Sequence, residues 1–264
     1  MSGSVNPDTV IILGDTTVNA HFVEEQYTLT ITIIGSGSVI LNPDQPTYTY
    51  GQNVQLIANP SVGWVFDHWS GDLTGSTNPD WILMDGDKAV NAHFVEISFD
   101  IPLVLGWNLV SVPLIQTNTS VTAVLASITG QYDMVQYYDV LDTTDHWKTY
   151  ATFKPPVLND LNMLNHKMGF WIHTTSACVL TVNGPIPPAT WIQLFAGTNM
   201  VGYPTLTTGV TVATALAGTG YDKVEVCDLG QPYNLIEVPD TYVMKAGEGY
   251  LVHVPADTLW TVNW

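Results

Sequence analysis

Residues 2–24 read SGSVNPDTVIILGDTTVNAHFVE, and residues 74–96 read TGSTNPDWILMDGDKAVNAHFVE. Aligned positions differ by 72 throughout, so His21 corresponds to His93. Self-similarity at a fixed period indicates a repeat architecture. One full unit over residues 25–96 therefore follows the last third of another. We expect residues 1–24 to form the C-terminal strands of a truncated unit, as in a segment of a longer array.

The full unit has the sequence pattern of β-strands. Residues 27–33 alternate threonine with apolar residues, which is typical of a strand with one face on a core. Asp85-Gly86 lies between the apolar runs 81–84 and 89–94, and this arrangement predicts a β-hairpin. We expect residues 25–98 to form a complete all-β domain.

Several short motifs of this unit occur in an order that resembles the divergent InlB B-repeat (Listeria–Bacteroides repeat) family. They are GSGSV at 35–39, NP at 42–43, GQNVQLIANPSVGWVF at 51–66, HWSGD at 68–72, TGSTNP at 74–79 and MDGDKAVNAHF at 84–94. The resemblance covers residues 26–96 as a whole unit and residues 2–24 as the tail of one. It implies secreted, tandemly repeated, non-catalytic modules of microbial cell-surface proteins, and it carries no ligand or catalytic residue.

A second duplication fills the rest of the chain. GWNLV at 106–110 returns as GTNMV at 197–201, and GFWIH at 169–173 returns as GYLVH at 249–253. Apolar residues at helical spacing predict one short helix in each copy. We therefore expect two copies of a β-rich module, copy 1 at 99–185 and copy 2 at 186–264. The pattern resembles, more loosely, modules of prokaryotic and especially archaeal secreted surface proteins, and no activity is attached to it.

The charge balance limits the partners of this protein. Six lysines, no arginine and 24 acidic residues give a formal net charge of −18. Nucleic acids are bound mainly through Lys and Arg contacts to phosphate, so a nucleic-acid partner is excluded. Anionic lipid surfaces are disfavoured for the same reason. Because no stretch of 18 consecutive apolar residues occurs, we expect no membrane insertion within this chain.

The sequence contains no recognisable catalytic motif, and we expect no enzymatic activity. A Gly-x-Ser-x-Gly elbow and a glycine-rich phosphate loop are both missing from it. His173 and His253 occupy equivalent positions in the two copies, without the clustered spacing that metal ligands require. We interpret them as repeated structural residues.

Calcium is the single cofactor for which the sequence offers ligands. Asp85 and Asp87, and likewise Asp142 and Asp145, place carboxylates in turns, and calcium prefers such oxygen ligands. Neither pair completes an EF-hand loop. The first pair also makes a good turn without any metal, so both interpretations stay open.

Aromatic residues concentrate between Tyr132 and Phe153, and much of that stretch is the insertion that makes copy 1 longer than copy 2. We single out Tyr138, Trp147 and Tyr150 as a platform that could stack on sugars or on a protein partner. The alternative is that they pack within the fold. Three further tryptophans are expected to be core residues: Trp69, Trp107 and Trp171.

Two smaller features bear on the compartment. Asn118 begins the sequence Asn-Thr-Ser, a candidate glycosylation site in an exposed loop. Cys178 and Cys227 are the two cysteines of the chain. They could form one disulfide or be two buried thiols.

These observations favour a structural or adhesive segment of an extracellular cell-surface protein or filament, built from serial β-modules. Its expected partners are other copies of itself or neighbouring surface-protein modules. Strand donation from the partial repeat is one expected mode of assembly, because unpaired strands seek partners. Alternatively, these strands pack on residues 26–96 of the same chain. The alternative is a carbohydrate-binding accessory module of a secreted hydrolase, with polysaccharide as the partner.

Overall fold

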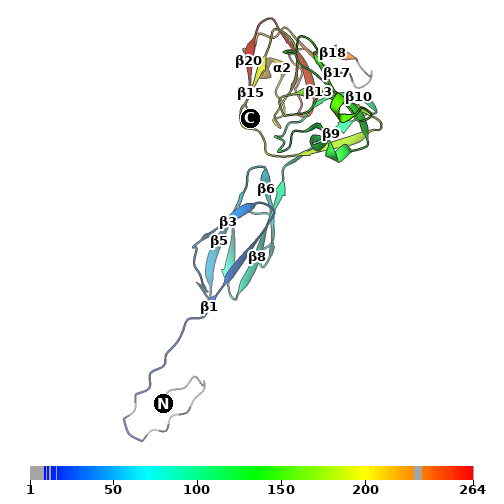
Figure 1. The fold of residues 1–264 in the computed structure, drawn as a ribbon. Coiled ribbons are helices and arrows are strands. Elements are labelled where there is room, and N and C mark those ends of the chain that lie inside the picture. The colour runs from blue at the N-terminus through cyan, green and yellow to red at the C-terminus, as the bar shows by residue number, and fades with distance from the viewer. Residues whose placement is uncertain (1–8, 10, 12, 16, 229–233, 264) are drawn as a thin grey trace.

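The computed structural model describes residues 9, 11, 13–15, 17–228 and 234–263. It is mainly β, with several small sheets and two short α-helices, which confirms the fold class of tandem β domains. The molecule is elongated (Figure 1). An extended N-terminal segment leads into a narrow β domain at 25–98, the repeat domain. The two copies then form a wider head, in which the chain ends.

The repeat domain is a sandwich of two three-stranded sheets. One sheet has the order β2-β8-β6 and the other β3-β5-β7. Strand β8 is central and pairs in parallel with β2 and antiparallel with β6. Side chains from both sheets share one core, which includes Leu56, Trp69, Ile82 and Phe94. The strands are β1 (Gln26–Tyr27), β2 (Leu29–Ile34), β3 (Gly37–Asn42), β4 (Tyr48–Thr49), β5 (Gln52–Pro60), β6 (Trp64–Gly71), β7 (Asp80–Met84) and β8 (Lys88–Glu96).

The prediction of a β-hairpin at Asp85-Gly86 is wrong. Strands β7 and β8 belong to different sheets, so the turn between them crosses the sandwich. The alternation on each side of the turn reflects burial against the shared core, and it does not reflect pairing between the two strands. Asp87 fixes the crossing, because its Oδ1 accepts hydrogen bonds from the Thr28 N–H at 2.7 Å and the Thr28 hydroxyl at 2.9 Å.

The strand expected at the end of the truncated unit is not formed. Residues 17–24, here called the tail, have no secondary structure and are exposed. Their counterpart in the full unit is β8, which is held by β2 and β6. Among the residues that the structure describes, no strand pairs with the tail. The rest of the truncated unit lies largely outside the described residues.

The two copies of the head have the same strand order. Copy 1 forms the sheets β10-β13-β11-β12 and β14-β9, and copy 2 forms β16-β19-β17-β18 and β15-β20. The elements of copy 1 are β9 (Ser98–Leu103), β10 (Gly106–Ser111), α1 (Val121–Val124), η1 (Ala126–Ile128), β11 (Tyr132–Tyr138), β12 (Trp147–Ala151), η2 (Pro156–Leu158), β13 (Gly169–Thr174) and β14 (Cys178–Asn183). Those of copy 2 are β15 (Thr190–Leu194), β16 (Gly197–Gly202), α2 (Val212–Ala215), β17 (Lys223–Cys227), β18 (Leu235–Glu237), β19 (Gly249–Val254) and β20 (Thr258–Val262).

The two copies pack against each other through equivalent surfaces, as in a symmetric dimer. The Ser111 N–H donates to the Gly247 carbonyl at 2.9 Å. The equivalent N–H of Gly202 donates to the Lys167 carbonyl, also at 2.9 Å. A buried cluster between the copies contains Leu109 and Trp171 together with their counterparts, Met200 and Leu251.

Glycine is required where the two copies touch. A Cβ added at Gly169 would lie 2.5 Å from the Val201 carbonyl oxygen. At the equivalent Gly249 it would lie 2.7 Å from the Val110 carbonyl oxygen. The backbones therefore approach too closely for any side chain at these two positions.

A short junction joins the repeat domain to the head. Ile97 is the one residue between β8 and β9. Its N–H donates to the Gly63 carbonyl at 2.9 Å, and its carbonyl accepts from the Gly184 N–H at 3.0 Å. Pro185 lies against Gly63. Ile97 is thus hydrogen-bonded both to the repeat domain and to copy 1 of the head, so no flexible linker separates these two parts of the described chain.

Candidate functional site

The best-formed candidate site is a cleft between the two copies of the head. Pairing places Tyr138 opposite Trp147 and Gln136 opposite Trp171. Alternate residues of a strand face the same side of a sheet. These side chains therefore share one face with Trp107, and that face looks toward copy 2. The cleft has a volume of about 480 Å³ and is lined by Trp107, Gln136, Tyr138, Trp147, Trp171, Thr198, Leu235 and Leu251.

The aromatic rings of the cleft meet edge to face. The centroids of Tyr138 and Trp147 lie 5.4 Å apart at 70°, and those of Trp107 and Trp171 lie 6.4 Å apart at 85°. His146 stacks on Tyr138 with centroids 5.0 Å apart. Trp147 is 45% exposed, whereas Trp171 is buried. The cleft thus has a firmly packed floor and an accessible aromatic rim.

Copy 2 carries no aromatic residue at the four equivalent positions. Trp107 and Trp171 correspond to Thr198 and Leu251, and Tyr138 corresponds to Cys227. In copy 1, Trp147 lies opposite Tyr138 in the neighbouring strand. In copy 2, Leu235 lies opposite Cys227 in the same way, so Leu235 is the counterpart of Trp147. The aromatic wall therefore belongs to copy 1 alone, and the small or aliphatic residues of copy 2 line the facing wall.

The residues singled out from the sequence separate into two groups. Tyr138 and Trp147 lie together in the cleft. Tyr150 does not, because it packs against the core of copy 1 near Tyr132, with ring centroids 6.5 Å apart. Trp107, expected in the core, is only partly buried and lines the cleft. The other six residues that line the cleft were not indicated as site residues by the sequence: Trp107, Gln136, Trp171, Thr198, Leu235 and Leu251.

The other two tryptophans expected in the core are buried. Trp69 is 1% exposed, and its indole N–H donates to the Thr77 carbonyl at 2.8 Å. Trp171 is 9% exposed, and it lies in the cluster between the two copies instead of inside either module.

The first candidate calcium turn is occupied by protein donors. Asp85 forms an ion pair with Lys88, which holds the pKa of that carboxyl below its usual value. Asp87 binds Thr28, whose backbone N–H lowers the pKa of Asp87 as well. Both carboxylates thus already serve the crossing between the sheets.

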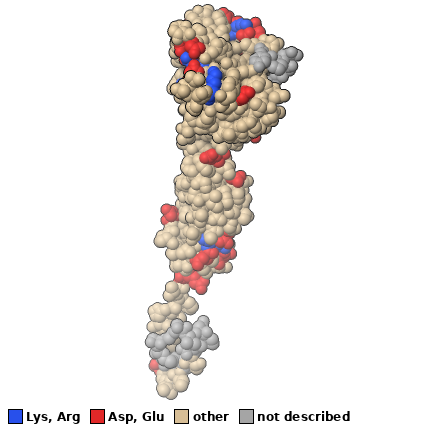
Figure 2. All heavy atoms as spheres, turned by 45° about the vertical axis from the view of Figure 1, so that its right-hand side comes forward, with Lys and Arg blue, Asp and Glu red and all other residues tan. Residues whose placement is uncertain are grey.

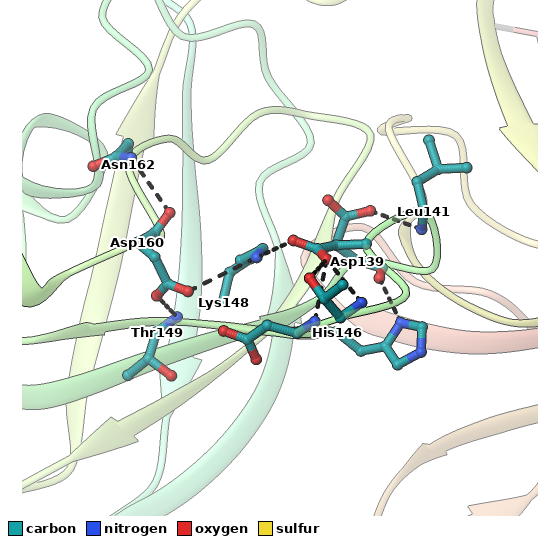
Figure 3. A network of polar contacts seen from close by, with 10 residues as sticks. Asp139, Leu141, His146, Lys148, Thr149, Asp160 and Asn162 are labelled. Atoms are coloured by element: carbon teal, nitrogen blue, oxygen red, sulfur yellow. Dashed lines mark hydrogen bonds and ion pairs between the residues drawn. The ribbon is translucent and has the colours of Figure 1, made fainter.

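The second candidate turn is organised around Lys148, which lies between Asp160 and the loop that begins at Asp139 (Figure 3). Asp142 Oδ2 accepts from Lys148 Nζ at 2.5 Å, and its Oδ1 accepts from the Thr144 N–H at 3.1 Å and hydroxyl at 2.7 Å. The Lys148 ammonium, first among these donors, holds the pKa of Asp142 far below its usual range. Asp145 donates its N–H to Asp142 at 3.1 Å. Within the described part of the chain, no three His, Cys, Asp or Glu side chains come together as a metal-binding group.

The repeated histidines make the same contact in both copies. His173 Nδ1 lies 2.6 Å from Asp133 Oδ1, and His253 Nδ1 lies 2.5 Å from Asp222 Oδ1. Each pair links the second-to-last strand of a module, β13 or β19, to β11 in copy 1 or to the residue directly before β17 in copy 2. This repetition is consistent with a structural role for His173 and His253.

The glycosylation candidate and the two cysteines are not among the residues that line the cleft, although Cys227 packs against the cluster between the copies. Asn118 is exposed, and its Oδ1 accepts from the Ser120 N–H at 3.0 Å. Cys178 and Cys227 are both free thiols, and partial burial raises the pKa of each. The structure therefore contains no bond between these two cysteines.

Charged side chains are sparse on the molecular surface. On the face drawn in Figure 2, Asp and Glu form small separate groups, often beside a lysine, and most of the surface is uncharged. Of the described residues, none belongs to a helix long and apolar enough to cross a bilayer.

The sequence comparison identifies the class of the repeat domain. Residues 27–98 match the family model described as the divergent InlB B-repeat domain, which confirms the resemblance seen in the sequence. A repeat of this family suggests a bacterial surface-protein repeat and an extracellular location. No curated protein and no solved structure matches the chain.

Proposed function

We propose that this chain is a non-enzymatic structural or adhesive segment of an extracellular surface protein, in which the repeat domain is a stalk that holds the duplicated head. The family match of residues 27–98 supports an extracellular repeat. The single-residue junction at Ile97 and the elongated outline (Figure 1) support a stalk.

The tail carries the observation on which the mode of assembly rests. Residues 18–24 read VNAHFVE, identical to residues 90–96 of β8. In β8, Val90 and Phe94 are 1% and 3% exposed. Their counterparts in the tail, Val18 and Phe22, are 67% and 93% exposed. The tail therefore presents the core residues of a central strand to solvent.

The tail would be stabilised most by a partner that supplies the two strands between which β8 lies in the full unit. In the full unit, β8 receives a parallel ladder from β2 and an antiparallel ladder from β6. A B-repeat unit whose β8 position is open, or whose own β8 is displaced by this strand of identical sequence, would bury Val18 and Phe22 and pair the whole segment. The acceptor is a repeat unit of another copy or of a neighbouring surface-protein module. Because donor and acceptor surfaces differ, repeated donation gives a head-to-tail filament.

Deleting residues 1–24 tests strand donation. The mass in solution is measured by light scattering across a concentration series, with circular dichroism as the control for folding. We expect the full chain to associate and the shortened chain to be a folded monomer. Association that is unchanged by the deletion would remove the tail from the assembly.

Protease treatment of intact source cells tests the location independently. We expect the protein to be cleaved without lysis, as an extracellular segment would be. Full protection until the cells are broken would contradict a surface role.

A further inference from the structure

We infer that the aromatic cleft between the two copies is a binding site for a neutral saccharide. The site goes beyond the proposed surface role and does not depend on the tail, which lies at the other end of the molecule (Figure 1).

The internal duplication shows that the fold does not require the aromatic residues. Copy 2 builds the same sheet order with Thr198, Cys227, Leu235 and Leu251 at the equivalent positions. Four large rings on one copy therefore exceed what packing of this module needs. The asymmetry is also what opens the cleft, because Thr198 and Leu235 face the rings with small or flexible side chains.

The lining matches the surface of a sugar ring. Ligand sites combine an apolar, aromatic lining with a few polar groups that fix orientation. Here Trp107, Tyr138 and Trp147 offer ring faces and edges to the C–H groups of a pyranose. Gln136 and Thr198 offer an amide and a hydroxyl to its hydroxyl groups. A volume of about 480 Å³ lies within the range of roughly 300–1,000 Å³ seen for small-molecule sites.

The charges favour a neutral ligand. None of the eight residues that line the cleft is charged. At the position of Gln136, copy 2 carries Glu225, which forms an ion pair with Lys223 at 2.7 Å. Copy 1 therefore places a neutral amide where its counterpart has a carboxylate. The net charge of −18 repels acidic polysaccharides. A cationic ligand would find no carboxylate among the described residues of the lining.

Access to the cleft is provided by its rim. Trp147 is 45% exposed, so part of its indole surface is available to a ligand. Binding there would change the environment of a half-exposed tryptophan. Tryptophan emission of the full chain is therefore a direct readout.

The test is a titration of the full chain with neutral hexa-oligosaccharides of glucose, mannose, galactose and N-acetylglucosamine, followed by tryptophan emission and calorimetry. Trp147→Ala removes the rim. Thr198→Trp gives copy 2 the residue that copy 1 has at the equivalent position, and so fills the cleft. Trp81→Ala is the matched control, since Trp81 is 55% exposed on β7 of the repeat domain.

We expect saturable binding of at least one neutral oligosaccharide. Trp147→Ala and Thr198→Trp should each weaken it at least tenfold, which equals about 1.4 kcal/mol, and Trp81→Ala should leave it unchanged. Absence of binding at millimolar sugar would overturn the proposal. So would binding that survives both cleft variants, or a cleft that takes up proline-rich peptides or quaternary ammonium ions in preference to sugars. The melting temperature of each variant shows whether it is folded, and either cleft variant alone suffices for the test.

Discussion

Phe94→Ala and Phe22→Ala form a matched pair, because the two phenylalanines occupy the same position of an identical heptapeptide. Phe94 is 3% exposed in β8, and its ring lies 5.8 Å from that of Phe66 in an edge-to-face contact. A Cβ at Gly37 would lie 2.5 Å from the Phe94 ring, so the ring fills its site completely. Phe22 is 93% exposed in the tail.

The expected costs differ widely. Truncating a buried phenylalanine to alanine costs about 3–5 kcal/mol. A domain the size of residues 27–98 has a total stability of roughly 4–11 kcal/mol, at about 0.05–0.15 kcal/mol per residue. Phe94→Ala should therefore remove between about a quarter and all of that stability. Phe22→Ala should leave the repeat domain of the monomer within about 0.5 kcal/mol of the unsubstituted protein.

Native-state hydrogen exchange of the full chain, resolved by peptide, separates the repeat domain from the head. In the Phe94→Ala protein, the slowest amides of residues 25–96 should exchange at least a hundredfold faster, while those of the head stay unchanged. Equal protection of the repeat domain in both variants, at concentrations where the protein is monomeric, would refute the assignment of β8 as the central strand.

Three further results are expected. The pKa of Asp142 is lowered in the folded protein, chiefly by Lys148. The ionised carboxylate therefore stabilises the turn at pH values above its usual pKa of 3.8, and this stabilisation is lost as the pH falls below 3.8. Asp142→Asn should remove the corresponding acid transition in Trp fluorescence. Because three of the four candidate calcium carboxylates (Asp85, Asp87 and Asp142) already bind protein donors, a chelator should leave the melting midpoint unchanged, and a lowered midpoint would restore the calcium hypothesis. Gly169→Ala and Gly249→Ala should each destabilise the head by about 1–3 kcal/mol in thermal melts, whereas Gly86→Ala, whose methyl would meet no atom within 4 Å, should be neutral, and a neutral result at both head positions would contradict the close inter-copy contact.

Repeats made the fold class readable from the sequence, because two duplications account for nearly the whole chain. The period of 72 marked the repeat domain, and the paired motifs marked the two copies of the head. What the repeats do not encode is which strands pair. Alternation tells which residues are buried, and a turn signal tells where the chain reverses. Neither shows that the turn at Asp85-Gly86 connects two sheets.

The tail fails as a strand for a related reason. Its sequence is that of β8, yet a strand forms only where a ladder is available. Identical residues are therefore buried in one place and exposed in the other. Local sequence specifies the potential to form this strand, and the partner decides whether it forms.

Only part of the cleft could be predicted from the sequence. Tyr138 and Trp147 stood out because they lie in the aromatic-rich stretch between Tyr132 and Phe153. Tyr150 could have been set aside, since it lies three positions after Trp147 and so faces the other side of a strand. The aligned copies also held a signal for Trp107, whose counterpart Thr198 shows that this position need not be apolar. That the faces of the two copies meet could not be read from the sequence, because it depends on how the copies dock.

The central claim is that the tail enters a partner as a β8 strand, and two neighbouring substitutions test it most directly. Phe22 and Val23 are 93% and 91% exposed in the tail, but their counterparts in β8 are 3% and 44% exposed. The association of the Phe22→Asp and Val23→Asp variants of the whole chain is compared by sedimentation at equal concentration. Strand donation would bury residue 22 in the core of the acceptor and leave residue 23 on its outer face. The account predicts that Phe22→Asp remains monomeric while Val23→Asp associates like the unsubstituted protein. Equal association of the two variants would contradict it.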